Sequence, residues 1–359
     1  DVPVKFTNSS GSGEIIKISD ILRNSESGML NSITAGKSVV FIAPAGQTVD
    51  VFTIPDARLI CPHFERLKLA SNGCFYHCDW CYLKLTYRAQ RPYMTIRVQY
   101  DKIKEQIIKR LNQSNAPVIF SSGELADSLS TEHLTGAMRE FIPWFGQSKN
   151  GYLYLLTKSA NVDHILDLPH NGHSIVAWSM NNETVSKKFE IGAPGFEQRL
   201  EAAYKVQQAD YPLRIRLDPI VPFDGWQDAY ADTIARIFKR ISPERITIGT
   251  LRFEKGFYRL RNSIFSTGPE LPAILEGMEP MFEPKVFEGS KQPRIGKYSY
   301  PEDTRIEIFD FIIKEIRKNS DCPIALCKES EAVWNQLGMD LSRCQCVCQL
   351  GCVDMTPKI

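Results

Sequence analysis

The sequence predicts a mixed α/β fold in which parallel strands form an open or closed barrel. The observation that supports this class is an alternation along the chain. Between about residues 66 and 253, short apolar or β-branched runs alternate with longer segments of helical period. No internal repeat is visible. Parallel strands joined by right-handed helical crossovers curl into an open or closed barrel. In such barrels the functional residues lie at the carboxyl ends of the strands, so we expect them there in this chain.

The individual elements follow from this alternation. The expected strands are 67–70, 117–120, 152–156, 174–178, 213–217 and 245–249. The expected helices are 100–111, 132–145, 196–209 and 226–240, where apolar residues recur every three or four positions, followed by an amphipathic helix over 302–318. Gly195 and the pair Ser242-Pro243 indicate helix boundaries.

The chain divides into four expected regions. Residues 1–65 form a β-containing N-terminal extension with an apolar run at Val39 to Ile42, and 66–255 form the barrel. Residues 256–340 form a C-terminal region on the substrate side, and 341–359 are a Cys-rich tail.

Composition and charge limit the class of protein. The 359 residues carry 43 Lys and Arg against 42 Asp and Glu, and 43% are hydrophobic, which is typical of a globular chain and excludes disorder for most of it. The net charge of +1 argues against a large, uniformly basic surface for nucleic acid. No run of 18 apolar residues occurs and Asp1 to Gly13 lacks a secretory layout, so we expect a cytoplasmic protein without a membrane partner.

The ten cysteines fall into two close groups and three single positions. Cys74, Cys78 and Cys81 form one group; Cys344, Cys346, Cys348 and Cys352 form the other; Cys61, Cys322 and Cys327 stand apart. Cysteines this close are poor disulfide partners and good ligands for one shared ion or cluster.

The first group is a C-x3-C-x2-C run directly after the first expected strand. Three thiolates of one loop can hold three corners of a cubic iron–sulfur cluster, whereas structural zinc sites generally need four ligands. One iron then stays open for a substrate or cofactor. The alternative is three buried or unrelated cysteines.

Several motifs together resemble one known family. Trp80 precedes Cys81, and further along stand Thr157-Lys158-Ser159, Val162-Asp163-His164, Trp178-Ser179-Met180-Asn181, Arg199-Leu200, Asp218-Pro219-Ile220-Val221-Pro222, Gly249-Thr250-Leu251-Arg252, Lys297-Tyr298-Ser299-Tyr300-Pro301 and Leu326-Cys327-Lys328-Glu329. This set resembles the spore photoproduct lyase branch of the radical S-adenosylmethionine (radical SAM) superfamily, over about residues 66 to 346.

The resemblance implies a partial (β/α)6 TIM-type barrel with a four-iron four-sulfur cluster at Cys74, Cys78 and Cys81. In this family the cluster reduces S-adenosylmethionine to a 5′-deoxyadenosyl radical, which abstracts hydrogen from a substrate. An electron donor such as flavodoxin or ferredoxin is also implied.

Residues at the expected strand ends match the cofactor site that this family implies. Gly123 lets the backbone approach closely, and Glu124 can pair with an ammonium group. Lys158 is the candidate for the carboxylate of S-adenosylmethionine. The other cofactor candidates are Ser122, Ser179, Asn181, Asp218 and Gly249, with Tyr82 and Glu124 as catalytic candidates. Taken singly, these residues also suit ordinary turns and solvated loops.

Two departures from the family argue against thymine-dimer repair. The family's hydrogen-donor cysteine falls near 124–126 here, where no Cys stands, and one of its tyrosines is replaced by Trp80. We therefore expect a small-molecule or nucleoside-type substrate rather than duplex DNA. The alternatives are dimer repair with a donor from elsewhere, such as the cysteine tail, and a metal-binding or SAM-binding interaction protein without turnover.

Two further features leave alternatives open. The tail group Cys344, Cys346, Cys348 and Cys352 can hold zinc or a second iron–sulfur cluster, with Cys327 or Cys322 brought in by folding, or it is a disordered tail whose cysteines oxidise. The basic stretch from Lys84 to Arg110 is interrupted by acidic residues, which favours a solvated helix face over a phosphate-binding surface.

Overall fold

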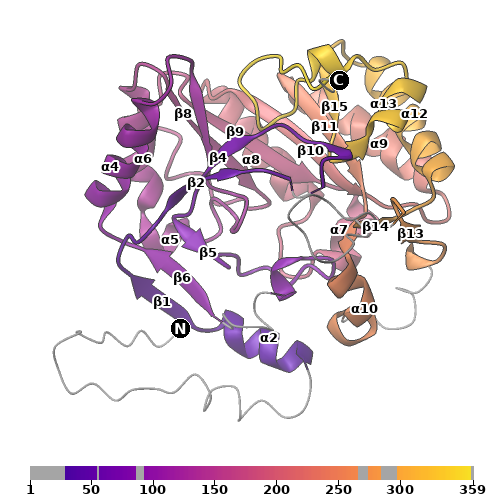
Figure 1. Ribbon diagram of the computed structural model, residues 1–359, viewed down its shortest axis with the longest axis horizontal. Coiled ribbons are helices and arrows are strands. Elements are labelled where there is room, and N and C mark those ends of the chain that lie inside the picture. The colour runs from indigo at the N-terminus through magenta and orange to yellow at the C-terminus, as the bar shows by residue number, and fades with distance from the viewer. Residues whose placement is uncertain (1–28, 55, 86–92, 266–273, 284–296, 357–359) are drawn as a thin grey trace.

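One large β-sheet organises the part of the chain that the computed structural model describes, residues 29–54, 56–85, 93–265, 274–283 and 297–356 (Figure 1). Its eight strands follow the order β15-β11-β10-β9-β8-β7-β4-β2. They are β2 (Val49–Phe52), β4 (Phe64–Leu67), β7 (Val118–Ser121), β8 (Gly151–Thr157), β9 (Ser174–Met180), β10 (Leu213–Ile220), β11 (Arg245–Thr250) and β15 (Ile324–Leu326). All neighbours pair in parallel except β2, which is antiparallel to β4 at one edge. The predicted α/β class is confirmed.

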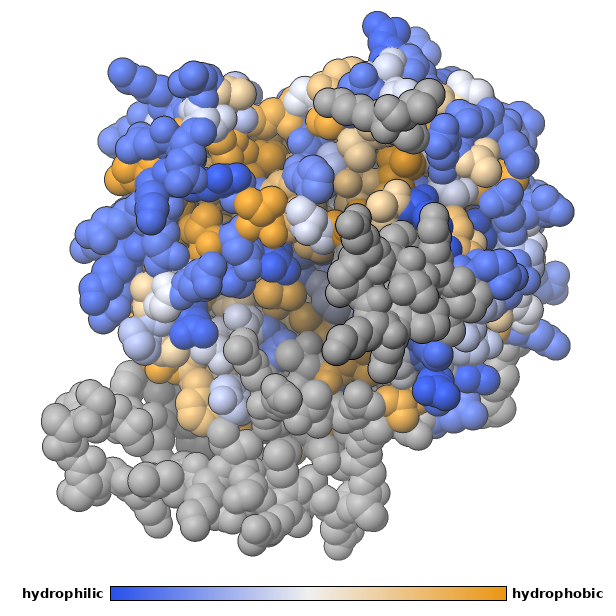
Figure 2. Space-filling model, viewed as in Figure 1, coloured by the Kyte–Doolittle hydropathy of each residue, from blue (hydrophilic) through white to orange (hydrophobic). Residues whose placement is uncertain are grey.

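Amphipathic helices cover the sheet. In Figure 1, α4 (Tyr100–Leu111) and α6 (Ala137–Gly146) lie at one end of the sheet, and α9 (Trp226–Arg240), α12 (Glu302–Arg317) and α13 (Glu331–Gln336) lie at the other. All seven residues of β9 are buried, as expected for a parallel strand covered on both faces. No helix in the described ranges is long and apolar enough to cross a membrane. Figure 2 shows hydrophilic residues over the outer helices and apolar residues towards the middle of this face.

Smaller elements complete the structure. The other helices are α2 (Met29–Lys37), α5 (Glu132–Thr135), α7 (Glu183–Phe189), α8 (Phe196–Gln208) and α10 (Lys255–Ile264), with a 3-10 turn at Leu341–Arg343. One small sheet contains β1 (Val40–Ala43), β6 (Met94–Arg97) and β5 (Ala70–Ser71), and another contains β12 (Phe253–Glu254), β14 (Lys297–Ser299) and β13 (Glu279–Pro280). Finally, β3 (Leu59–Ile60) pairs with β16 (Glu329–Ser330).

The first predicted strand, 67–70, was wrong in position. The strand in the large sheet is β4, which ends at Leu67, and Ala70 begins β5 in a different sheet. The segment from Leu67 to Ala70 therefore passes from one sheet to another. The amide of Lys68 between the two strands donates to the carbonyl oxygen of Thr48 at 2.8 Å and so follows the neighbouring edge strand.

The predicted helix 132–145 divides into α5 and α6. Gly136 stands between them with φ of 55°, a left-handed conformation that glycine adopts at little cost. The carboxylate of Glu132 then accepts a hydrogen bond from the amide of Met138 at 2.8 Å, in the first turn of α6. The other predicted helices agree with α4, α8, α9 and α12 to within one residue.

The large sheet also takes strands from outside residues 66–255. β2 comes from the N-terminal extension, and β15 comes from the C-terminal region and pairs with β11. The tail is held by two arginines near the amino ends of β10 and β11. Arg214 donates to the carbonyl oxygens of Val347 and Gln349 at 2.7 Å each, and Arg245 donates to three carbonyls between Gln349 and Gly351 at 2.5–3.2 Å.

Candidate functional site

The three-cysteine loop lies beside the carboxyl ends of the parallel strands. At its start, Gly73 forms a bridge with Ala126 in the loop after β7, and the amide of Asp127 donates to the Gly73 carbonyl at 3.0 Å. A Cβ at position 73 would lie 2.3 Å from the Cβ of Ala70, so the position requires glycine. Within the loop, the amide of His77 donates to the carbonyl of Ile191 at 2.7 Å. The loop is thus tied to the connection after β7 and to the connection between β9 and β10.

A buried charge network stands next to the Cys78 thiol. Lys158, which follows β8, donates to the Ser179 hydroxyl at 2.9 Å and lies 3.5 Å from the Glu190 carboxylate. Arg199 pairs with the same carboxylate at 2.5 Å. Burial raises the pKa of the Cys78 thiol to about 12, and the Lys158 ammonium opposes this rise by favouring the thiolate. The candidate cluster ligand and the candidate cofactor ligand therefore influence each other directly.

The loop after β7 packs against the end of β8. A Cβ on Gly123 would lie 2.6 Å from the Leu156 carbonyl oxygen, so only glycine fits. The Ser122 and Ser128 hydroxyls share a hydrogen bond of 2.8 Å. The Tyr82 hydroxyl donates to the backbone carbonyl of Glu124, which places both catalytic candidates at the same rim.

The Asp127 carboxylate organises this rim, although the sequence analysis did not single it out. One oxygen accepts from the Thr157 hydroxyl at 2.6 Å and from the amides of Leu129 and Ser130 at 3.0 and 2.9 Å. The other oxygen accepts from the Lys158 amide at 2.7 Å. An Asp whose side chain accepts hydrogen bonds from amides two and three residues later is a common turn former, so the segment that begins at Asp127 could have been recognised in the sequence.

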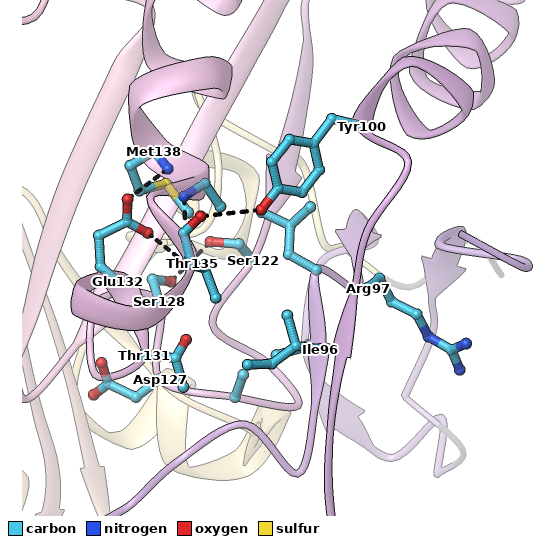
Figure 3. Close-up of a pocket in the computed structure, with 14 residues that line it drawn as sticks. Ile96, Arg97, Tyr100, Ser122, Asp127, Ser128, Thr131, Glu132, Thr135 and Met138 are labelled. Carbon is cyan, nitrogen blue, oxygen red and sulfur yellow. Dashed lines mark hydrogen bonds between the residues drawn. The ribbon is translucent and has the colours of Figure 1, made fainter. Parts of the chain in front are cut away.

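A small pocket is lined in part by the same loop (Figure 3). In it, the Glu132 carboxylate points towards the first turn of α6, and the Tyr100 hydroxyl donates to the Thr135 carbonyl at 3.4 Å. Burial raises the pKa of Glu132 to about 7. Asp127 and Ser122 line this pocket as well, so the loop of the cofactor candidates forms part of its wall.

Asp218 forms a second charged group with Arg216 and Arg252 near the carboxyl end of β10, and Gly249 of β11 packs against it. The Asp218 carboxylate accepts from Arg216 at 2.7 Å and from Arg252 at 3.0 Å. Burial alone would raise the pKa of Asp218, but the two guanidinium groups lower it well below its usual range. A Cβ on Gly249 would lie 2.8 Å from an Arg252 nitrogen. Arg216 also donates to the Cys327 thiol at 3.0 Å.

Both ends of the Asn181 side-chain amide already have hydrogen-bond partners within the protein. Its amide nitrogen donates to the Pro219 carbonyl at 2.7 Å, and its oxygen accepts from the Tyr230 hydroxyl at 2.7 Å. The residue is 1% exposed, so its contacts in this structure brace β9 against β10. Its predicted role towards a cofactor stays a prediction.

The structure brings most predicted residues to one rim but arranges no finished metal site. Among the described residues, no three His, Cys, Asp or Glu side chains are positioned to hold an ion. The donor set of the first group nevertheless fits a cluster, because Cys74, Cys78 and Cys81 are free thiols of one braced loop. In the tail, the Cys346 and Cys348 sulfurs are 3.4 Å apart, while Cys352 is exposed. Zinc or a second cluster there stays a prediction.

Several residues of the site escaped the sequence analysis as functional candidates. The missed residues that form ion pairs in the site are Glu190, Arg216 and Arg252. The sequence around Glu190 contains no local motif that could have revealed it. Arg199 and Arg252 belong to quoted motifs, but their pairing with Glu190 and with Asp218 required the packed structure.

A parallel barrel with a three-cysteine loop at its strand ends defines a member of the radical SAM superfamily. Comparison with known proteins places it more narrowly. The family model described as "Spore photoproduct lyase" matches residues 62–319, so the chain belongs to the spore photoproduct lyase family.

Individual relatives agree with this placement. The spore photoproduct lyase of Bacillus subtilis (strain 168) is 37% identical over 162 residues, which are 45% of this chain and 47% of that protein. That of Geobacillus sp. (strain Y412MC61) is 34% identical over 186 residues, 51% of this chain and 53% of that protein. The chain thus spans about half the length of these two relatives.

The fold of this chain is similar to that of solved spore photoproduct lyase structures. Spore photoproduct lyase complexed with dinucleoside spore photoproduct has a TM-score of 0.70 at 24% identity, covering 84% of this chain and 86% of that one. A double mutant with bound AdoMet and dinucleoside spore photoproduct has a TM-score of 0.69 at 25% identity, covering 84% and 85%. The expectation that DNA is an unlikely partner finds no support in these relatives.

Proposed function

We propose that this chain is a radical SAM lyase of the spore photoproduct type, which repairs a thymine dimer. Membership of the family favours this reading over the small-molecule substrate expected from the missing donor cysteine. The observation that supports it best is the junction between the cluster loop and the cofactor candidates. The amides of His77 and Asp79, on either side of Cys78, donate to the carbonyls of Ile191 and Phe189, on either side of Glu190, at 2.7 and 2.8 Å, and Glu190 pairs with Lys158 and Arg199.

The residues of this junction have distinct tasks in the proposal. A four-iron four-sulfur cluster with bound S-adenosylmethionine would supply the 5′-deoxyadenosyl radical that starts the reaction. Cys74, Cys78 and Cys81 would hold the cluster. Lys158 is held in place by Glu190 and would pair with a carboxylate, because 18% of its side chain is exposed.

A further charged pair would lie on the substrate side. Glu124 and Lys328 lie 3.8 Å apart, and both line an inner cavity together with Arg216. Each cation already has a carboxylate partner, Asp218 for Arg216 and Glu124 for Lys328, so these groups would act on a ligand as hydrogen-bond donors.

The proposal is tested by anaerobic reconstitution with iron and sulfide, followed by dithionite, S-adenosylmethionine and dinucleoside spore photoproduct. Formation of 5′-deoxyadenosine and of the repaired dinucleotide is expected. The Cys78→Ala variant should lose both, and Cys322→Ala, a matched change outside the loop, should keep both. Cleavage of S-adenosylmethionine without repair of the lesion would contradict the proposed substrate, and absence of cleavage would contradict the proposed chemistry.

Three finer parts of the proposal follow. Flavodoxin or ferredoxin is the proposed electron donor, and the ten free cysteines favour a reducing cytoplasm. For the tail, iron analysis distinguishes the alternatives, since about four irons per chain indicate one cluster and about eight indicate two. Replacement of Cys346 and Cys348 by Ser should lower the iron content only in the second case.

A further inference from the structure

Two buried ammonium groups lie against the three-cysteine loop. Lys84 is buried three residues after Cys81, and its amide donates to the Cys81 carbonyl oxygen at 3.0 Å. Lys37 is also buried and comes from the last turn of α2, in the N-terminal extension. Its ammonium group donates to the carbonyl oxygen of Tyr76, inside the loop. Lysine is rarely buried in folded proteins, so both positions call for a physical reason.

Lys84 forms an ion pair in the interior. Its ammonium nitrogen lies 3.4 Å from the carboxylate of Asp79, which stands between Cys78 and Cys81, and neither side chain is more than 1% exposed. Burial lowers the pKa of Lys84, whereas Asp79 and a thiolate at Cys81 oppose this change and favour the charged form. A buried ion pair contributes little net stability because both ions lose their hydration. Stability alone therefore does not explain the pair.

Aromatic side chains surround this pair and the loop. The centre of the Phe265 ring lies 5.9 Å from the Lys84 ammonium nitrogen, and the Trp80 ring in the loop packs against Phe189 at 5.3 Å. In surroundings of low dielectric constant, a charge acts more strongly on its neighbours than at an exposed surface. The charges of Lys84 and Asp79 therefore act on the neighbouring thiolates with little screening by solvent.

Fixed charges of this kind influence a bound iron–sulfur cluster in a known direction. Reduction adds one negative charge to a cluster, so a nearby cation stabilises the reduced form more than the oxidised form and raises the reduction potential. A nearby carboxylate has the opposite effect. Lys37 and Lys84 therefore favour reduction of a cluster in this loop, and Asp79 opposes it.

We propose that Lys84 and Lys37 raise the reduction potential of the cluster in the three-cysteine loop, and that Asp79 limits this rise. The inference rests on the proposed function, because it requires a cluster in this loop, but it does not depend on which substrate is used. The three residues act through the cluster and are positioning residues. The N-terminal extension thereby gains a task, since α2 supplies Lys37.

The reduction potential tests the proposal directly. The protein is reconstituted anaerobically with iron and sulfide and titrated with dithionite at fixed pH without S-adenosylmethionine, and the reduced cluster is followed by electron paramagnetic resonance. Lys84→Met keeps a long side chain without the charge. At a given potential we expect its ratio of reduced to oxidised cluster to fall about tenfold, a downward shift of about 59 mV for one electron. Lys37→Met should shift the potential in the same direction.

Two further variants and a control separate charge from structure. Asp79→Asn should raise the potential, and Lys84→Arg, which keeps the charge, should stay within about twofold of the wild-type ratio. A general loosening of the loop would not produce shifts of opposite sign. The matched control is Lys187→Met, which removes an exposed ammonium group from α7. The carbonyl of Phe189 in the same helix accepts from the Asp79 amide at 2.8 Å, so the control is close to the loop but screened by solvent, and its potential should not change.

The outcomes separate the inference from the proposed function. A wild-type protein that takes up no cluster would overturn both. A Lys84→Met protein with full iron content whose potential equals or exceeds that of the wild type would overturn the inference alone, as would a fall in Asp79→Asn. Where Lys84→Met takes up no iron, Lys37→Met, which leaves the pair with Asp79 in place, decides by the same criterion. Lower potentials in both Lys→Met variants and a higher one in Asp79→Asn support the inference.

Discussion

Asp127→Asn is a small change that should weaken the rim of the barrel considerably. The Asp127 side chain is nearly the same size as asparagine and is buried, and it accepts four hydrogen bonds through two oxygens. In the best orientation of the amide, its oxygen keeps the three donors of Leu129, Ser130 and Thr157. Its NH2 group then faces the Lys158 amide, which is also a donor, at the position of the present 2.7 Å contact.

The cost can be worked out from this geometry. A hydrogen bond to a charged group contributes about 1.5–3 kcal/mol, and an unsatisfied buried donor costs about 1–3 kcal/mol. Relaxation of the loop recovers part of this sum, so we expect Asp127→Asn to lower the free energy of unfolding by about 2–4 kcal/mol. Because the lost contact holds the backbone of Lys158, affinity for S-adenosylmethionine should fall as well.

Denaturant unfolding followed by circular dichroism measures the loss. The matched control is Asp163→Asn, the same substitution at a residue whose side chain is 77% exposed and pairs with Lys205 at 2.8 Å on the surface. An exposed pair of this kind contributes about 0–1 kcal/mol. If Asp127→Asn and Asp163→Asn shifted the unfolding midpoint equally, the assignment of Asp127 as the organising residue of the rim would be refuted.

Three further predictions concern packing, the tail and pH. Gly123→Ala places a Cβ 2.6 Å from a backbone oxygen and should lower the melting temperature, whereas Gly256→Ala, with nothing within 4 Å, should not; thermal unfolding decides. Arg245→Gln removes contacts to three tail carbonyls and should speed limited proteolysis of the tail, while Arg236→Gln on the exposed face of α9 should leave its rate unchanged. The pKa of Glu132 is raised in the folded state from 4.5 to about 7, so folding favours its protonated form. Its stabilising contribution is complete below pH 4.5 and is lost as pH rises towards 7, so Glu132→Gln should flatten that part of the stability curve; an unchanged slope would contradict the assignment.

The sequence by itself determined the order of the elements and the chemistry of the first cysteine group. Five of the six expected strands and most helices could be placed because apolar periodicity reports burial directly. The first strand failed because an apolar run does not show where the chain leaves one sheet for another, and helix 132–145 failed because Gly136 is tolerated in a helix as well as between two helices.

Only the tertiary structure decided which distant groups share a space. Glu190 meets Lys158, Arg252 meets Asp218, and Cys61 lines one cavity with Glu124, although the members of each pair are far apart in the chain. Charge pairing and cavity walls depend on distances across the barrel, and local sequence patterns carry no information on those distances. For the same reason the tail, which the sequence offered as a separate metal site or a disordered end, became the floor of the barrel once Arg214 and Arg245 held its backbone.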